Sequence, residues 1–255
     1  MPMLNFKYQC TMKKPVVLLF SLLFATANIF AQGAKTEMEK AQKSGKSIYL
    51  IVTDKSATDT DVLEKMVNDA LKKTSNTVKI KLYRDDKDNS NLITKYRLSF
   101  ATLPLVLVLA SNGVVSGGLT TKDATVEKLI SYLPTKKQAE VLLGFENGKA
   151  AFIVCGKKND KDKASLEKEC KTAIEGLGNN ANMFFVDVNS KEEANFLALL
   201  KPDLTKTTVL VFNGRGQYTG TLEASAKSKD LIALVNKKIG GGCCSGGNSG
   251  SCGKK

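Results

Sequence analysis

The sequence has no histidine and no tryptophan, and its six cysteines form no Cys-x-x-Cys pair. The absence of histidine excludes imidazole metal ligands, imidazole general bases and nucleophiles that are activated by histidine. Any catalysis would therefore depend on Cys, Lys, Asp, Glu, Ser or Tyr side chains. These absences favour a protein that binds over an enzyme.

Arginine is scarce as well, because the 38 basic residues include only Arg84, Arg97 and Arg215, while the formal net charge is +13. Proteins that read nucleic acid usually use arginine clusters or aromatic stacking platforms. Here lysines alternate with carboxylates, as in KNDKDK at 158–163. The pattern predicts a solvated basic surface and no nucleic-acid partner, with non-specific attraction to anionic surfaces.

The N-terminus has the pattern of a secretory signal peptide. A positive segment at 12–14 precedes VVLLFSLLF at 16–24, and small residues follow at 25–31. This nine-residue run is too short to span a bilayer but has the length of a signal-peptide core. No later segment is long and apolar enough for a membrane span. We therefore expect an exported protein, periplasmic or extracellular, whose mature form has no membrane span.

We expect the leader to comprise residues 1–31, with cleavage after Ala31 and cleavage after Ala27 as the alternative. Residues 1–11 then form an upstream extension, with Met12 as a second candidate for the start of translation. Export places the mature chain where disulfides persist. Five cysteines remain after cleavage, and an odd number leaves at least one thiol for another role.

The chain contains an internal repeat, because 104–119 and 207–222 match without a gap at an offset of 103 residues. Each copy has an apolar run, a Gly/Asn turn and a second short strand, which predicts a β-hairpin. The flanking elements also occur twice: opening strands at 47–53 and 150–155, long helices at 62–73 and 164–177, second strands at 78–86 and 181–189, short helices at 91–98 and 192–200, and closing helices at 123–133 and 228–239, the last with a Ser or Asp cap.

Each repeat therefore predicts a β-α-β-α-β-β-α unit preceded by a helix, at 37–46 and at 135–149. The opening strands are nearly continuous in apolar residues, as expected for a sheet covered on both faces. The fold class is α/β, with a central mixed sheet flanked by helices in each of two domains. We place these domains at 34–134 and 135–239, followed by a flexible Gly/Ser/Cys tail at 240–255.

The segment YRLSFATLPLVLVLASNGVVSGGL at 96–119 carries a family resemblance. It is similar to the thioredoxin family's pattern of Tyr, a short loop, a hydrophobic residue, Pro, an apolar strand, Asn-Gly and a second strand. The resemblance implies two tandem thioredoxin-like domains over nearly all of 34–239. It also implies that Pro104 occupies the family's cis-proline position.

The same resemblance shows what this chain is missing. The family's Cys-x-x-Cys follows the first strand, where a helix N-terminus lowers a thiol pKa. That position reads Ser56-Ala57-Thr58-Asp59 in the first unit and falls near 158–160 in the second, and Thr207 stands where Pro104 would recur. The resemblance therefore implies redox-silent modules of the kind that serve as binding or spacer domains.

Two other polar segments are interpreted as structural. Ser56 has no histidine to activate it, so we interpret it as a helix cap. RDDKDN at 84–89 lacks the alternating ligands and the glycine of a calcium loop, so it predicts a solvated loop.

Cys155 ends a predicted core strand, and Cys170 lies on the apolar face of the helix at 164–177. Both therefore point inward. Two interpretations remain open: ordinary small core residues, or a structural disulfide between strand and helix.

The remaining cysteines, Cys243, Cys244 and Cys252, lie in the tail GGGCCSGGNSGSCGKK, which has nothing to bury. Three chemistries fit these thiols: Cu(I) carriage, Zn²⁺ binding completed by a further donor, and a disulfide relay. The fourth interpretation is an incidental tail. We therefore expect an exported, non-catalytic thioredoxin-fold protein that docks a partner protein and presents tail thiols for soft-metal carriage or thiol exchange. The alternatives are an oxidoreductase that uses only tail cysteines, and a structural scaffold or adaptor.

Overall fold

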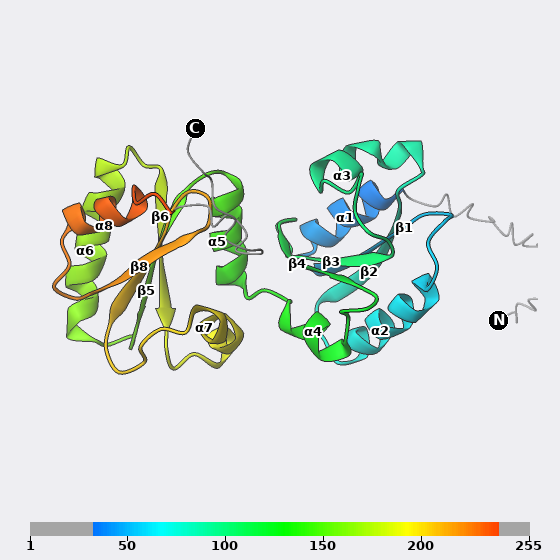
Figure 1. Cartoon of the computed structure of the whole chain (residues 1–255). Helices are drawn as coiled ribbons and strands as arrows, with labels where there is room; N and C mark the ends of the chain where they lie inside the picture. The colour runs from blue at the N-terminus through cyan, green and yellow to red at the C-terminus, as the bar shows by residue number, and fades with distance from the viewer. Residues whose placement is uncertain (1–32, 240–255) are drawn as a thin grey trace, which may run out of the picture. The chain divides into compact units, whose positions relative to one another are not determined.

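The computed structural model describes residues 33–239, and its first sheet is built from the first half of them (Figure 1). The four strands have the order β2-β1-β3-β4, in which β1 and β2 are parallel and the other neighbours antiparallel. The elements are α1 (Ala34–Lys43), β1 (Ser47–Thr53), α2 (Thr60–Lys72), β2 (Thr77–Tyr83), a 3₁₀ turn (Lys87–Asn89), α3 (Ser90–Lys95), β3 (Leu105–Leu109), β4 (Val115–Thr120) and α4 (Val126–Ser131).

The second sheet repeats this arrangement with the order β6-β5-β7-β8. Its elements are α5 (Lys136–Glu146), β5 (Ala150–Gly156), α6 (Lys161–Gly176), β6 (Ala181–Asp187), a 3₁₀ turn (Lys191–Glu193), α7 (Ala194–Leu200), β7 (Thr208–Phe212), β8 (Tyr218–Glu223) and α8 (Ser228–Val235). The prediction of two mixed sheets flanked by helices is confirmed. The boundary between the domains at residues 134 and 135 stays a prediction.

The internal repeat extends to an irregularity in the backbone. The pairing of β3 with β4 shifts register between Val108 and Leu109, and that of β7 with β8 shifts between Val211 and Phe212. These positions correspond at the offset of 103 residues found in the sequence. Because both hairpins have the bulge at corresponding positions, it is a regular part of this hairpin and not a local defect.

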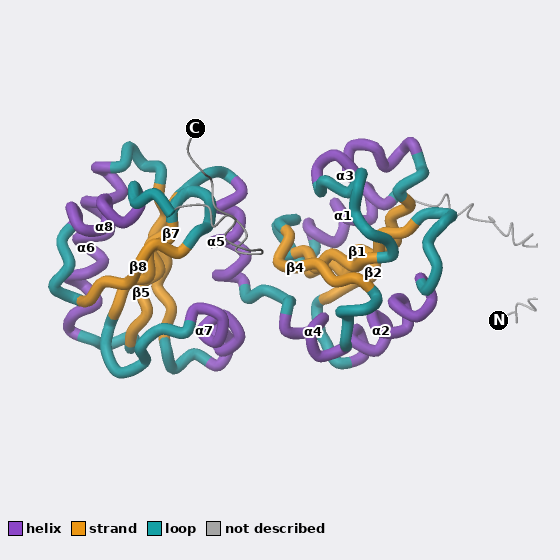
Figure 2. Tube along the Cα trace, in the orientation of Figure 1, coloured by secondary structure: helices purple, strands orange, loops and turns teal. Residues whose placement is uncertain are grey.

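Each sheet is buried on both faces, which explains the continuous apolar strands. In the first sheet, Ile48, Leu50 and Val52 of β1 pack with α1 and α3, while Tyr49 and Ile51 pack with α2 and α4. Figure 2 shows helices on both sides of the strands. The period-2 alternation of a strand therefore decides which layer each side chain enters.

In the second sheet, even-numbered residues of β5 pack with α6 and α8, and odd-numbered residues pack with α5 and α7. Phe152 and Val154 belong to the first group, and Ile153 and Cys155 to the second. The offset of 103 is odd, so corresponding positions have opposite parity. Cys155 consequently corresponds to Val52 of the first sheet.

Helix starts follow local capping, with one difference from the sequence expectation. Thr125, Thr135 and Asp160 accept hydrogen bonds from backbone N–H groups at the starts of α4, α5 and α6. The cap of α8 is Lys227, whose N–H donates to the Asp230 carboxylate at 3.0 Å, and Ser228 is already helical. The prediction of a Ser or Asp cap for this helix was therefore wrong, because the capping position is held by Lys227. Asp230, three residues into the helix, accepts the hydrogen bond from the backbone N–H of that cap.

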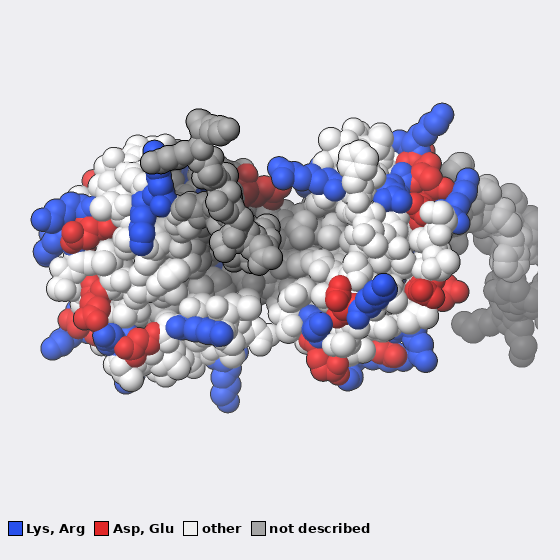
Figure 3. All heavy atoms as spheres, viewed as in Figure 1, with Lys and Arg blue, Asp and Glu red and all other residues white. Residues whose placement is uncertain are grey.

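The exposed surface mixes both signs of charge. Figure 3 shows lysines and arginines among aspartates and glutamates on the visible face. Several lysines pair with carboxylates, including Lys79 and Lys81 with Glu64 at 2.6 and 2.7 Å. Over residues 33–239, no helix is long and apolar enough to cross a membrane. The predicted signal peptide lies outside the described residues.

Candidate functional site

In the first domain, Arg84 links the segments that follow β1 and β2 and precede β3, at the end of the sheet where β1 and β2 terminate. The parallel strands β1 and β2 end there, and the loop before β3 arrives there. The guanidinium of Arg84 donates to Asp54 Oδ2 from Nε at 3.1 Å and from Nη2 at 2.5 Å, and Nη1 donates to the Ala101 carbonyl at 2.8 Å. Because Arg84 is planar and has several donors, one side chain fixes both loops.

Asp54 lies where the first strand leads into the segment that replaces Cys-x-x-Cys. Its Oδ1 accepts from the Ser56 N–H at 3.0 Å and from Ser56 Oγ at 2.7 Å. The hydrogen bond from the Ser56 hydroxyl and those from Arg84 hold the pKa of Asp54 below its usual range. The carboxylate is therefore a structural acceptor and a poor proton donor or base.

The interpretation of Ser56 as a helix cap was wrong. Helix α2 begins at Thr60, four residues later, and Asp59 precedes it with a positive φ of 61° and no side-chain cap. Ser56 instead closes a turn on Asp54, whose carboxylate engages both its N–H and its hydroxyl. A serine hydroxyl that donates to a depressed-pKa carboxylate has no activating base, so no nucleophile is assembled here.

The loop before β3 exposes one large apolar side chain. The relative exposure of Phe100 is 101%, whereas Leu103 is half-buried and Pro104 is buried. The peptide bond between Leu103 and Pro104 is cis, as the resemblance implies. The bond from Arg84 to the carbonyl of Ala101, next to Phe100, attaches this loop to the sheet edge. Phe100 is therefore an apolar contact group on an anchored loop.

In the second domain, different residues occupy the strand end that corresponds to the Pro104 loop. Thr207, which stands for Pro104, is buried, and its hydroxyl donates to Asp160 Oδ2 at 2.7 Å. Gly156 at the end of β5 lies beneath it: a Cβ built on Gly156 would lie 2.3 Å from Thr207 Oγ1. Hydrogen bonds from the Asp162 N–H and from Thr207 lower the pKa of Asp160. The three residues are therefore tightly packed, and the hydroxyl of Thr207 and the carboxylate of Asp160 are both hydrogen-bonded.

Cys155 and Cys170 are free thiols in the structure, and both are fully buried. Burial raises the pKa of each thiol to about 12. Of the two open interpretations, the disulfide is contradicted and the ordinary core residues remain, because Cys155 faces the layer of α5 and α7, whereas Cys170 of α6 packs on the opposite face of the sheet. The expectation that both point inward was correct, but they enter different cores.

The thiol and metal candidates Cys243, Cys244 and Cys252 lie outside the described residues. Within residues 33–239, no group of three Cys, Asp or Glu side chains is placed to hold a metal ion. The carboxylates of 84–89 are all exposed, which agrees with the prediction of a solvated loop. Asp86 accepts from the Asp88 N–H at 3.0 Å, and Asp85 lies 3.8 Å from Lys55.

Sequence reasoning did not identify Arg84, Asp54 or Phe100 as a group. Arg84 was visible as one of only three arginines, and Phe100 as an aromatic residue four positions before a proline. They lie close together because the parallel strands β1 and β2 end at the same side of the sheet where the antiparallel strand β3 begins. Along the chain, the bonded residues Asp54, Arg84 and Ala101 are up to 47 positions apart.

No protein-family model matches the chain, and no curated protein matches it in sequence. Several solved structures are similar in fold. The first two thioredoxin domains of Saccharomyces cerevisiae Eps1p match at 12% identity and a TM-score of 0.33, covering 82% of this chain and 97% of that one. Zinc-bound human ERp44 matches at 9% identity and a TM-score of 0.33, covering 79% of this chain and 57% of that one.

A disulphide isomerase from Xylella fastidiosa matches at 19% identity and a TM-score of 0.30, covering 42% of this chain and 90% of that one. Identities of 9 to 19% and TM-scores near 0.3 identify no family or activity for this chain. The strand orders β2-β1-β3-β4 and β6-β5-β7-β8, with helices on both faces, give each domain the central mixed sheet flanked by helices that the thioredoxin resemblance implies.

Proposed function

We propose that this chain, whose folded part is two tandem thioredoxin-like domains, is an exported binding protein. Its first domain docks a partner protein, and Cys243, Cys244 and Cys252 present thiols to that partner. The observation that supports the proposal is the burial of Cys155 and Cys170, together with the absence of a Cys-x-x-Cys pair from the sequence.

The two folded thiols are chemically inert at neutral pH. Their pKa values of about 12 leave almost no thiolate, which is the form that attacks disulfides and binds soft metals. Once a leader containing Cys10 is removed, the only other thiols are the three in the tail. Thiol chemistry in the exported protein therefore depends on residues 243, 244 and 252.

Soft-metal carriage is the first form of this function. Two or three thiolates on a glycine-rich segment suit Cu(I), which accepts low coordination numbers, while Zn²⁺ would require a fourth donor. Thiol exchange with a partner is the second form. A disulfide between Cys252 and either Cys243 or Cys244 would leave one thiol for a mixed disulfide.

The exposed face at Phe100 is the proposed docking surface. An apolar aromatic side chain that is wholly exposed on an anchored loop supplies contact area to a partner without reorganisation of its backbone. In the second domain the residue at the offset of 103 is Asp203, and the neighbouring Leu204 is 55% exposed, against 101% for Phe100. We therefore assign docking to the first domain.

The test is truncation at Gly240, compared with the full chain. Protein exported by the host should begin at Gln32 and contain three titratable thiols under native, reducing conditions, and none after truncation. Stoichiometric Cu(I) binding that is lost on truncation supports metal carriage. Formation of a mixed disulfide with a model thiol that is lost on truncation supports exchange.

Two outcomes lead to the alternatives. If the full chain reduces insulin catalytically and the truncated chain does not, the protein is an oxidoreductase with tail cysteines as its only redox groups. If truncation changes neither metal binding nor exchange, the tail is incidental and the protein is a scaffold or adaptor. Cytoplasmic retention of the full chain with residues 1–31 intact would contradict export.

A further inference from the structure

The thiol of Cys155 lies in the layer between the second sheet and the helices α5 and α7. Figure 1 shows these two helices on the same side of that sheet. Cys155 is fully buried although it stands near the end of β5, and α7 contributes a single fully buried residue, Phe196, to the same cluster. The part of this cover that comes from α7 therefore depends chiefly on one side chain.

The corresponding layer of the first domain is packed more fully. There α3 and the residues after it bury Leu92, Ile93 and Leu98 in the cluster that contains Val52. In the second domain, a hollow of about 530 Å³ lies between residues 199–201, at the end of α7, and side chains of β7 and β8. The C-terminal end of α7 therefore packs incompletely on its sheet.

The segment that contains α7 is anchored at its two ends. At its start, Thr135 Oγ1 donates to Glu193 Oε2 at 2.7 Å, and at its end Lys206 pairs with Glu223 of β8. Between these anchors, the side chains of residues 194–202 form no hydrogen bond or ion pair with another described residue. A segment with few buried contacts between two fixed points can open locally while the rest of the domain stays folded.

The layer that α7 covers also contains an unpaired hydroxyl. Thr208 is the antiparallel partner of Cys155, so both side chains point into the layer of α5 and α7. Thr208 is 1% exposed, and its Oγ1 has no hydrogen-bond partner in the described part of the chain. The corresponding residue of the first domain is Leu105. A buried hydroxyl without a partner destabilises the closed state and gains water when the layer opens, which favours opening in the second domain.

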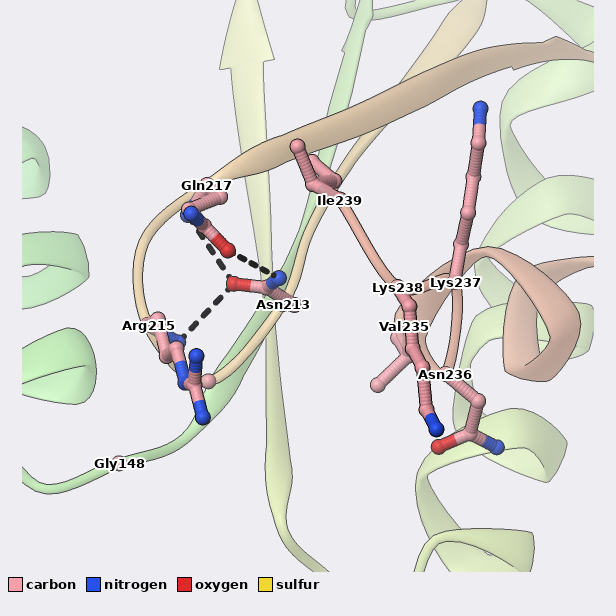
Figure 4. A pocket seen from close by; sticks show the side chains of 10 residues that line it. Gly148, Asn213, Arg215, Gln217, Val235, Asn236, Lys237, Lys238 and Ile239 are labelled. Carbon is pink, nitrogen blue, oxygen red and sulfur yellow. Dashed lines mark hydrogen bonds between the residues drawn. The ribbon is translucent and has the colours of Figure 1, made fainter. Parts of the chain in front are cut away.

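The sheet under α7 is held independently of that helix. Strand β5 pairs with β6 and β7, and β7 pairs with β8. Figure 4 shows the far end of β7 and β8, where Asn213 Oδ1 accepts from the N–H groups of Arg215 and Gln217 at 3.0 and 3.1 Å. On the other face, α6 is attached to α8, because the Ser228 N–H donates to Glu169 Oε2 at 2.9 Å. Movement of α7 therefore leaves the sheet and the opposite layer in place.

We propose that residues 194–205 form a lid, the α7 lid, that opens while the second sheet stays folded and makes Cys155 a conditional site of thiol modification. In the closed state, burial raises the pKa of Cys155 to about 12, and opening removes that cause. With iodoacetamide as the probe, the sulfur of Cys155 bonds to the methylene carbon, iodide leaves and the thiol proton passes to solvent. Cys170, in the layer of α6 and α8, reacts only after the whole domain unfolds.

The experiment uses the reduced full chain with only its two folded thiols, so serine replaces the other four cysteines: Cys10→Ser, Cys243→Ser, Cys244→Ser and Cys252→Ser. Mass spectrometry of peptides follows alkylation of Cys155 and Cys170 in the same sample, and rates in high urea give the intrinsic reactivity of each thiol. After this correction, Cys155 should react at least about tenfold faster than Cys170 without urea, and its rate should rise less steeply with urea. Equal corrected rates with equal urea dependence would overturn the proposal.

Two matched variants identify the element that moves. Phe196→Ala removes the buried side chain of α7 and should raise the alkylation rate of Cys155 at least about tenfold. Leu166→Ala removes a fully buried side chain of α6 on the opposite face, so it should raise the rate of Cys170 and leave that of Cys155 within about twofold. Phe196→Leu and Leu166→Val make the same comparison should either variant unfold. An unchanged Cys155 rate in the first variant, or equal rises at both thiols in the second, contradicts the α7 lid.

The role of the unpaired hydroxyl has its own variant. Thr208→Val replaces the hydroxyl with a methyl group and should slow alkylation of Cys155 about fivefold, because the closed state no longer buries an unpaired donor. An unchanged rate would show that Thr208 stays covered when Cys155 is exposed and would contradict the opening of this layer. The result is independent of the proposed tail function, because the test chain has no tail thiols and the truncation at Gly240 leaves Cys155 in place.

Discussion

The two domains share a fold and a register but differ at the strand end where the resemblance would place chemistry. In the first domain, Arg84 draws Asp54 and the Ala101 carbonyl together beside an exposed Phe100. In the second domain, buried Thr207 bonds to Asp160 and packs on Gly156. Arg84 therefore links the loops of the first strand end, whereas a buried threonine fills the second.

The comparison shows that two copies of one fold can stabilise the same strand end with different residues when neither has a Cys-x-x-Cys pair. Both positions are stabilised by a carboxylate of lowered pKa, so neither keeps an acid–base group. The first domain retains an exposed apolar side chain, which suits docking. In the corresponding loop of the second domain the exposed apolar side chain is the smaller Leu204, which is 55% exposed.

The largest effect on stability is expected from adding a methyl group at Gly156, where the second domain is tightly packed. Gly156→Ala places a Cβ about 2.3 Å from Thr207 Oγ1 and 3.0 Å from its Cβ and Cγ2, so the Thr207 side chain must shift away from its bond to Asp160. We expect a loss of about 3 kcal/mol in the free energy of unfolding, measured with urea. Gly156→Ala/Thr207→Ala should recover half of that loss or more. A double variant as unstable as the sum of the two single variants would contradict this packing.

The next effect compares the buried thiol with its counterpart in the first domain. Cys155 and Val52 correspond in the repeat, and both are 0% exposed. Cys155→Ser and Val52→Thr each bury a hydroxyl in an apolar cluster, so each should cost about 1–3 kcal/mol in urea unfolding. If the cysteine variant alone were tolerated, the two positions would not be equivalently buried.

A smaller effect should appear as acid sensitivity in both domains. The folded pKa values of Asp54 and Asp160 are lowered by their hydrogen-bond donors, so the unfolded chain binds these protons first. Their contribution to stability is present above the unfolded pKa near ~4 and is lost as the pH falls through the folded pKa.

Asp54→Asn and Asp160→Asn should each flatten the decline of the urea midpoint as the pH falls from about 5 to about 2. Glu175→Gln, at an exposed position of α6, serves as the control and should leave the decline unchanged. An unchanged slope in either aspartate variant would show that its hydrogen bonds do not persist in solution.

The smallest effect on stability is expected at Phe100. Phe100→Asp replaces an apolar side chain that is fully exposed by a charged one. The free energy of unfolding should change by less than about 0.5 kcal/mol. Partner retention on the immobilised full chain should fall, whereas Val62→Asp, at an exposed position of α2, should leave it unchanged.

Much of the fold could be predicted from residue patterns. The opening strand at 47–53 was placed at its observed bounds, and the two hairpins followed from a match at an offset of 103 residues. The site was less predictable. Ser56 was assigned to a helix that begins at Thr60, because a polar residue before an apolar periodic segment indicates a cap without fixing which polar residue it is.

The sequence by itself determined the local elements, the repeat and the absence of a Cys-x-x-Cys pair, because periodicity and composition are properties of neighbouring residues. Tertiary structure decided which helix covers which face of a sheet. That decision puts Cys155 and Cys170 in separate cores and brings Arg84 to Asp54 and Ala101. Such contacts depend on the side from which each crossover returns to the sheet, and no short stretch of sequence records that direction.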